Sequence, residues 1–188
     1  MKNTINRQDP RAKRTRLLLQ QALGEMLTER SFASVTVADI TRRAGVNRAT
    51  FYAHFQDKDD LLEWTLREKC RRVLGAALPA SQPPSPEAWR HLVRCILDFF
   101  AEMPCRCPQA ARQWNGIVTN AMREELDCRL EDWLAENWLA EEAARQTMIA
   151  AVSGAIVTSG MQWLRGSAEV TTAEGAAALT AFIVKGMQ

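Results

Sequence analysis

The sequence has 188 residues, of which 47% are apolar and 24% are charged. This length and composition are those of a globular protein, and they exclude a disordered or collagen-like chain. Apolar runs fall short of the ~20 residues that a membrane span needs. The first residues, MKNTINRQDPRAKRTR, are polar and basic and lack the apolar stretch of a secretory signal. We therefore expect a cytoplasmic protein.

Charge is distributed unevenly along the chain, although the net charge is only +2. Residues 1–72 contain 15 Lys and Arg against 9 Asp and Glu, a net of +6, whereas residues 73–188 contain 9 against 13, a net of −4. A basic first third predicts contact with a polyanion such as DNA. A chance asymmetry of the surface would give the same counts, so charge alone does not decide between the two.

Helical periodicity dominates the chain, and no segment alternates convincingly with the period of a β-strand. The proline- and serine-rich segment LPASQPPSP predicts a loop over residues 78–86. We therefore expect an all-α protein. The predicted helices are, in chain order, 11–29, 37–44, 48–54, a helix starting near Asp57, 87–103, 110–140 in one or two pieces, 141–164 and 172–187.

The two short helices are marked by residues that begin and end helices. Thr36 and Asn47 are N-cap residue types, and Gly45 between the helices can adopt the positive φ of a helix C-terminus. Asp57, with Asp60 three residues on, resembles a capping box for the next helix. Two short helices joined by a glycine-containing turn have the anatomy of a helix-turn-helix motif.

The stretch GVNRATFYAHF, residues 45–55, combines an apolar and a polar face. The residues expected to form the seam between the helices are Ile40, Ala44, Val46, Phe51 and Phe55. The residues then left facing outward are Asn47, Arg48, Thr50, Tyr52 and His54. Side chains of these types bind base edges and phosphates, so we expect the second short helix to enter the major groove of DNA.

The segment TVADITRRAGVNRATFYAHFQDKDDLL closely resembles the DNA-binding segment of TetR-family (tetracycline-repressor-type) transcriptional regulators. The shared pattern is a Thr-capped helix, Ala-Gly-Val, then Thr-hydrophobic-Tyr-x-His-Phe with a following Lys and Leu. The resemblance covers roughly residues 12–65. Thr41, where the family usually has a small apolar residue, and Ala53, where a bulkier one is frequent, depart from the pattern.

The resemblance implies roles for individual residues. It implies a helix-turn-helix DNA-binding domain over residues 1–58, with a basic N-terminal arm, and an all-helical dimerisation and effector-binding domain over residues 59–188. Arg48, Ala49 and Thr50 would lie nearest the bases, and Lys58 would be one of the residues that hold the DNA backbone. The full set of expected DNA-binding residues is Thr36, Arg43, Asn47, Arg48, Ala49, Thr50, Tyr52, His54 and Lys58.

The resemblance also implies a homodimer, a palindromic double-stranded operator and an apolar small-molecule effector that releases a repressor from DNA. Small and apolar side chains of the last two helices suit a dimer interface, although a buried helix pair would use the same types: Ala151, Gly154, Ala155, Gly160, Leu179, Phe182 and Ile183. Candidate pocket residues, equally suited to an ordinary core, are Trp89, Phe100, Met103, Trp114, Met122, Trp133 and Trp163.

The segment PCRCP leaves a further alternative open. Cys105 and Cys107 could bind a soft metal together with Cys95, Cys128 or His91. They could also form a redox pair, with Arg106 lowering the pKa of a thiol. A thiol- or metal-responsive regulator is therefore one alternative, and a helical protein-interaction module that has lost DNA readout is another. The sequence contains no metalloprotease, serine-hydrolase or phosphate-loop motif, so we expect neither an enzyme nor a bound cofactor.

Overall fold

The computed structural model describes residues 10–79, 83–103, 108–135 and 141–186, with side chains from residue 115 onward in the third range. The described residues contain no β-strand, which confirms the expected all-α fold. The helices are α1 (Pro10–Glu29), η1 (a 3-10 turn, Phe32–Ser34), α2 (Val37–Ala44), α3 (Arg48–His54), α4 (Lys58–Ala77), α5 (Pro86–Ala101), α6 (Pro108–Ala135), α7 (Glu142–Leu164) and α8 (Thr172–Gly186).

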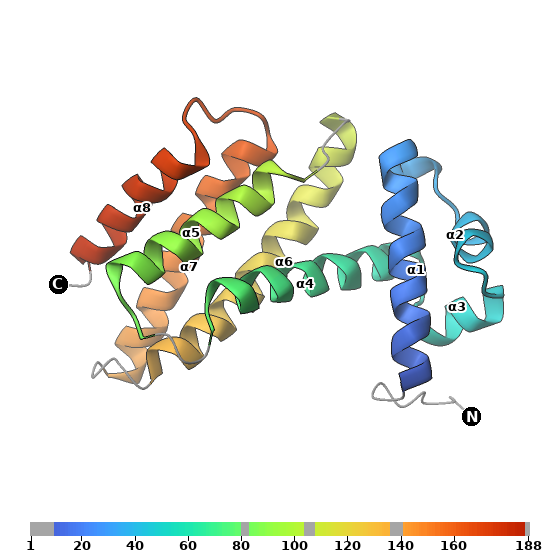
Figure 1. Cartoon of the computed structure of the whole chain (residues 1–188), viewed down its shortest axis with the longest axis horizontal. Coiled ribbons are helices and arrows are strands. Elements are labelled where there is room, and N and C mark those ends of the chain that lie inside the picture. Colours follow the sequence, from blue (N-terminus) through green and yellow to red (C-terminus); the bar gives the residue numbers. More distant parts are fainter. Residues whose placement is uncertain (1–9, 80–82, 104–107, 136–140, 187–188) are drawn as a thin grey trace. The chain divides into compact units, whose positions relative to one another are not determined.

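The chain divides into two compact units, residues 1–66 and 67–188, and the division falls inside α4. The boundary expected from the sequence, after Lys58, lies at the beginning of the same helix. In the first unit, α1 packs against both α2 and α3 (Figure 1). In the second unit, α7 packs against α5 and α6, and α8 packs mainly against α5.

The boundaries of α2 and α3 agree with the sequence prediction because both helices are capped by their own neighbours. The Thr36 hydroxyl accepts a hydrogen bond from the Asp39 N–H at 3.2 Å, and the Asp39 carboxylate accepts one from the Thr36 N–H, which completes a capping box. Gly45 ends α2 with φ of 67°, a conformation that costs glycine little. The Asn47 side chain accepts a hydrogen bond from the Thr50 N–H at 2.7 Å and so begins α3.

The core of the first unit forms where α1, α2, α3 and the beginning of α4 meet. Its fully or almost fully buried side chains are Leu19, Leu23, Met26, Phe32, Ile40, Phe51, Phe55, Leu61 and Leu62. Thr41, one of the two departures from the family pattern, is also buried. Its hydroxyl donates a hydrogen bond to the Ala38 carbonyl at 3.1 Å, so the polar group is satisfied inside the core.

Lys58 makes polar contacts with residues that are distant from it in sequence. Its ammonium group donates hydrogen bonds to the carbonyl oxygens of Phe32 (3.0 Å), Ala33 (3.3 Å) and Val35 (2.9 Å). The same nitrogen lies 4.6 Å from the centre of the Phe32 ring, within the range of a cation–π contact. Lys58 therefore ties the start of α4 to the turn that precedes α2.

The second unit is built around α5, which is buried along a whole face. Its buried residues are Ala88, Trp89, Leu92, Val93, Ile96, Leu97 and Phe100. Gly160 of α7 lies against Phe100, and a Cβ atom at that glycine would be 2.3 Å from a ring carbon. A Cβ atom at Gly175 of α8 would be 2.5 Å from a carbon of the Trp163 ring. The small residues therefore permit close packing within one chain.

By length and composition, α7 is the one described helix that is apolar enough to cross a membrane. In the structure this helix packs against α5 and α6, and residues along its length, from Ile149 to Leu164, are buried inside the unit. The apolar character of α7 is accounted for by its place in the helical core.

Replacing Gly160 with alanine tests the close approach of α7 to the Phe100 ring. Because the added methyl group has no room beside a fully buried ring, we expect Gly160→Ala to lower the free energy of unfolding by about 1–3 kcal/mol. Gly154→Ala on the same helix is the matched control, since its Cβ would meet only the flexible end of Arg123 at 3.3 Å. Denaturant unfolding measures both; equal stability of the two variants would contradict the packing described here.

Replacing Lys58 with alanine tests whether the lysine holds the first unit together. Loss of three charge-assisted hydrogen bonds predicts a decrease of about 1–3 kcal/mol in the free energy of unfolding. Lys13→Ala, at an exposed lysine of α1, should change stability by less than about 0.5 kcal/mol. If Lys58→Ala unfolds like the wild type but binds every DNA sequence more weakly, the lysine is a phosphate contact and the structural role is wrong.

Candidate nucleic-acid interface

α3 buries Phe51 and leaves most of its other side chains exposed. Phe51 is completely buried and packs edge-on against the Tyr52 ring, with 5.5 Å between ring centres. This contact leaves the Tyr52 side chain 52% exposed. Arg48 and Ala49, in the first turn of α3, are also exposed. The helix thus presents a guanidinium, a methyl group and a phenol on one side and buries its phenylalanine on the other.

Arg48 differs from the other arginines nearby because no carboxylate among the described residues pairs with it. Arg43 forms a two-pronged ion pair with Glu29 of α1, with N–O distances of 2.6 and 2.8 Å. Arg42 pairs with Asp39. Guanidinium groups suit the O6 and N7 acceptors of guanine, and the free group in this motif is the one at the beginning of α3.

Besides Arg43, three of the expected contact residues already use their polar groups inside the first unit. The Thr36 hydroxyl donates to the Asp39 carboxylate at 2.7 Å, and the Thr50 hydroxyl donates to the Asn47 amide oxygen at 2.9 Å. Lys58 donates to three backbone carbonyls. Phosphate oxygens accept hydrogen bonds only, so each of these groups would have to give up an internal bond to hold DNA.

His54 is half-buried, and its Nδ1 atom has no hydrogen-bond partner among the described residues. Burial lowers the pKa of His54, and the positive charge of Arg16 lowers it further. The imidazole is therefore neutral at neutral pH. It adds no positive charge to this face.

Sequence reasoning missed the carboxylates that organise the motif. Asp39 receives hydrogen bonds from Thr36, which hold its pKa below the usual range, and it also pairs with Arg30 at 3.1 Å. The hydrogen bond from Arg43 likewise lowers the pKa of Glu29. The Thr-x-x-Asp spacing of Thr36 and Asp39 is the local signal that predicts the first of these sites.

The candidate ligand residues of the second unit lie mostly in its core. Trp89 and Trp133 are buried with 4.9 Å between ring centres, and Phe100 and Met122 are completely buried. Trp163 is half-buried, and the side chain of Trp114 lies outside the described residues. Met103 is the member of this set that lines a pocket among the described residues.

The candidate dimer residues divide into three groups by burial. Gly160 and Ile183 are buried inside their own unit, because helical spacing alone does not tell which face of a small-residue helix is the inner one. Gly154, Ala155 and Leu179 are half-buried. Ala151 and Phe182 are exposed, and Phe182 reaches 70% exposure.

The cysteines give no metal cluster within the described part of the chain. Cys70 is buried, and burial raises the pKa of its thiol to about 12. The Cys95 sulfur lies 3.7 Å from a ring nitrogen of His91, and burial raises its pKa as well. Cys128 is exposed, whereas Cys105 and Cys107 lie outside the described residues.

The sequence of the helix-turn-helix segment is similar to sequences of known regulatory proteins. Residues 19–64 match the family model described as bacterial regulatory proteins, tetR family. A segment of 76 residues, 40% of this chain, is 38% identical to YxbF, an uncharacterised HTH-type transcriptional regulator of Bacillus subtilis (strain 168). That match spans only 20% of the length of YxbF.

Solved structures match the fold over most of the chain. The TetR-family repressor AlkX from Dietzia sp. strain DQ12-45-1b, implicated in biodegradation of n-alkanes, gives a TM-score of 0.66 at 20% identity, covering 92% of this chain and 97% of its own. FadR from Bacillus subtilis, solved in complex with stearoyl-CoA, gives 0.58 at 16% identity, covering 92% and 99%. Residues 19–64 therefore resemble the tetR family by sequence, and the helical architecture of the chain resembles that of these solved regulators by structure.

Proposed function

We propose that the protein is a cytoplasmic homodimeric repressor that binds a palindromic operator through α3 and leaves it when a small molecule binds the second unit. The observation that carries the DNA-binding part is the exposed guanidinium of Arg48, which has no carboxylate partner among the described residues. It lies one turn from the exposed Tyr52 ring, on the outer face of a helix whose inner face is fixed by Phe51. No catalytic role is part of this proposal.

Base reading falls to the first turn of α3 in this proposal. Arg48 offers two parallel donors, which suit guanine, and the Ala49 methyl group suits the methyl group of thymine. Tyr52 lies one turn further along the same face and is placed to donate its hydroxyl to a phosphate. Asn47, Thr36, Thr50, Arg43 and His54 flank this surface and are proposed as secondary contacts.

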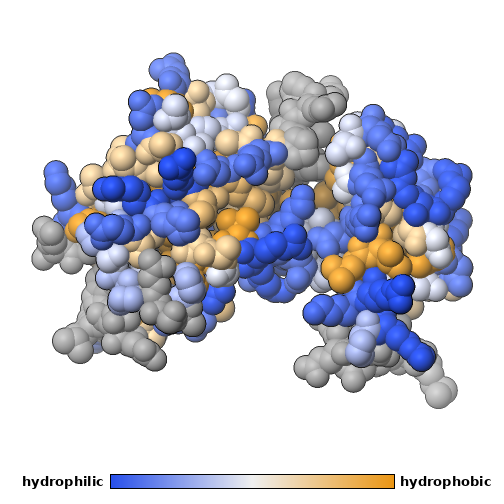
Figure 2. All heavy atoms as spheres, viewed as in Figure 1, coloured by the Kyte–Doolittle hydropathy of each residue, from blue (hydrophilic) through white to orange (hydrophobic). Residues whose placement is uncertain are grey.

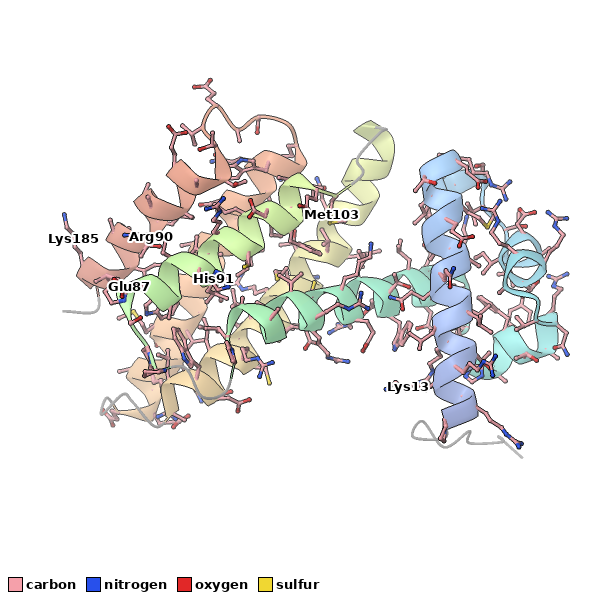
Figure 3. The ribbon with its side chains drawn as sticks, in the orientation of Figure 1. Lys13, Glu87, Arg90, His91, Met103 and Lys185 are labelled. Atoms are coloured by element: carbon pink, nitrogen blue, oxygen red, sulfur yellow. The ribbon has the colours of Figure 1, made fainter. Side chains whose placement is uncertain are left out.

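Positive charge near α3 supports an approach to DNA. The beginning of α1 carries exposed Lys13 and Arg14, and Lys13 extends from the first turns of this helix in Figure 3. Both belong to the same unit as α3, which α1 contacts directly. Such residues attract the duplex regardless of its sequence.

The dimer part of the proposal is supported by the exposed side of α8. Phe182 is 70% exposed, more than any other large apolar side chain of the described residues, and Ala178 and Ala181 beside it are exposed as well. Exposed Ala151 adds a small residue on α7. Apolar surface of this kind is typical of protein interfaces, and two-fold pairing gives two recognition helices for two half-sites one helical turn, about 34 Å, apart.

A small-molecule effector is supported by the relatives. AlkX is implicated in n-alkane degradation, and FadR was solved with stearoyl-CoA. An effector that binds one dimer conformation more tightly shifts the population toward that conformation and so changes operator affinity.

Replacing Arg48 tests the DNA-binding proposal. Genomic fragments selected by the wild-type protein should contain a palindromic site. We expect Arg48→Ala to lose about 1–3 kcal/mol of discrimination against a changed guanine in that site, whereas Arg90→Ala on α5 should retain it. Competition binding with wild-type and changed operators measures the difference. If the wild type selects no site, and Arg48→Ala and Tyr52→Ala both leave regulation intact, the protein works through protein contacts instead.

Replacing Phe182 tests the dimer. A buried carboxylate at the centre of an apolar interface is costly, so we expect Phe182→Glu to convert the dimer to a folded monomer and to weaken operator binding by about 100-fold or more. Val170→Glu places the same charge at another exposed apolar position, 51% exposed in the wild type, and should remain dimeric. Light scattering coupled to size exclusion measures the mass, and circular dichroism verifies the fold. A dimeric Phe182→Glu variant would place the interface elsewhere.

A further inference from the structure

A pocket of about 240 Å³ lies between α4 and the C-terminal end of α5 in the second unit. Its lining residues are Lys69, Arg72, Val73, Phe99, Glu102 and Met103. The three apolar members are half-buried, and the three charged members are exposed. Figure 2 shows apolar surface next to strongly hydrophilic surface in this part of the unit, and Figure 3 shows Met103 at one end of α5.

The cations of this pocket differ from their neighbours on α4. Arg67 and Arg71 lie on the opposite side of the helix, where both are paired with carboxylates of α6 at 2.6 to 2.9 Å. Lys69 and Arg72 are three residues apart and therefore share a face. No carboxylate of the described residues forms an ion pair with either of them, so this face of α4 presents two positive charges above an apolar floor.

We propose that this pocket binds a small organic monoanion with an apolar tail. The carboxylate of the ligand lies against Lys69 and Arg72, and its tail packs on Val73, Phe99 and Met103. The proposal that this anion is the effector rests on the proposed function. It concerns a site formed wholly within the second unit.

Size and charge narrow the class of ligand. The volume is below the 300–1,000 Å³ of pockets that enclose drug-sized molecules, which favours a ligand of about ten non-hydrogen atoms. Glu102 brings one negative charge to the rim and leaves a net charge of +1 on the lining side chains. That balance suits a single carboxylate and disfavours a phosphate dianion.

Calorimetric titration of the full-length protein without DNA tests the proposal, with octanoate as the probe. We expect one octanoate per chain. 1-Octanol, which has the tail without the charge, should bind about fivefold more weakly, and acetate, which has the charge without the tail, about 100-fold more weakly or worse. Equal affinity for octanoate and 1-octanol, or no octanoate binding, would overturn the proposal.

Three variants locate the binding. The double variant Lys69→Gln/Arg72→Gln should bind octanoate about fivefold more weakly and 1-octanol unchanged, because it removes the partner of the carboxylate alone. Glu102→Gln should bind octanoate about two- to threefold more tightly. Arg90→Gln, at an exposed arginine near the other end of α5 (Figure 3), is the matched control and should bind like the wild type. An equal loss in Arg90→Gln, or none in the double variant, would place the anion elsewhere.

These results are separable from the operator experiment because they are measured without DNA. If the protein selects no operator but shows this pattern of octanoate binding, the proposed repressor function is wrong and the proposed anion pocket is supported. If the protein selects an operator but does not bind octanoate, the proposed regulatory function is supported and the proposed anion pocket is wrong.

Discussion

The ammonium group of Lys58 is the contact on which the shape of the first unit most depends. Its three acceptors, the carbonyls of Phe32, Ala33 and Val35, lie in the short 3-10 turn and at the residue directly after it. By binding them, the lysine fixes the chain just before α2 begins. The position of α2 then fixes α3, because the two helices share the buried side chains of Ile40 and Phe51. The proposed DNA-reading face of α3 is therefore oriented by a residue outside that helix.

A different constraint organises the second unit. The apolar face of α5 needs partners at close range, and the glycines at positions 160 and 175 provide the room beside Phe100 and Trp163. Close backbone approach of this kind gives many dispersion contacts per residue. Most of the aromatic side chains that were candidates for lining a ligand pocket are therefore buried in the core. The pocket that contains Met103 lies at the C-terminal end of α5 instead.

Local chemistry could be predicted from the sequence, and long-range chemistry could not. Thr36, Gly45 and Asn47 act on atoms within a few residues of themselves, so the limits of α2 and α3 agree with the prediction residue for residue. The carbonyl acceptors of Lys58 lie 23 to 26 residues before it in the sequence. No local pattern around Lys58 predicts contacts with residues so far away. For the same reason the inward orientation of Gly160 and Ile183 became evident only with the fold.

The carboxylate partners of Arg42 and Arg43 have a consequence for the thermodynamics of binding. A cation releases condensed counterions from DNA only when its charge neutralises a phosphate. Arg43 is held by Glu29, and Arg42 shares Asp39 with Arg30. A count of lysines and arginines in the first unit therefore overstates the number of ions released. The slope of affinity against salt reports the cations without internal partners, and a steeper slope than they allow would reveal that these ion pairs open on the duplex.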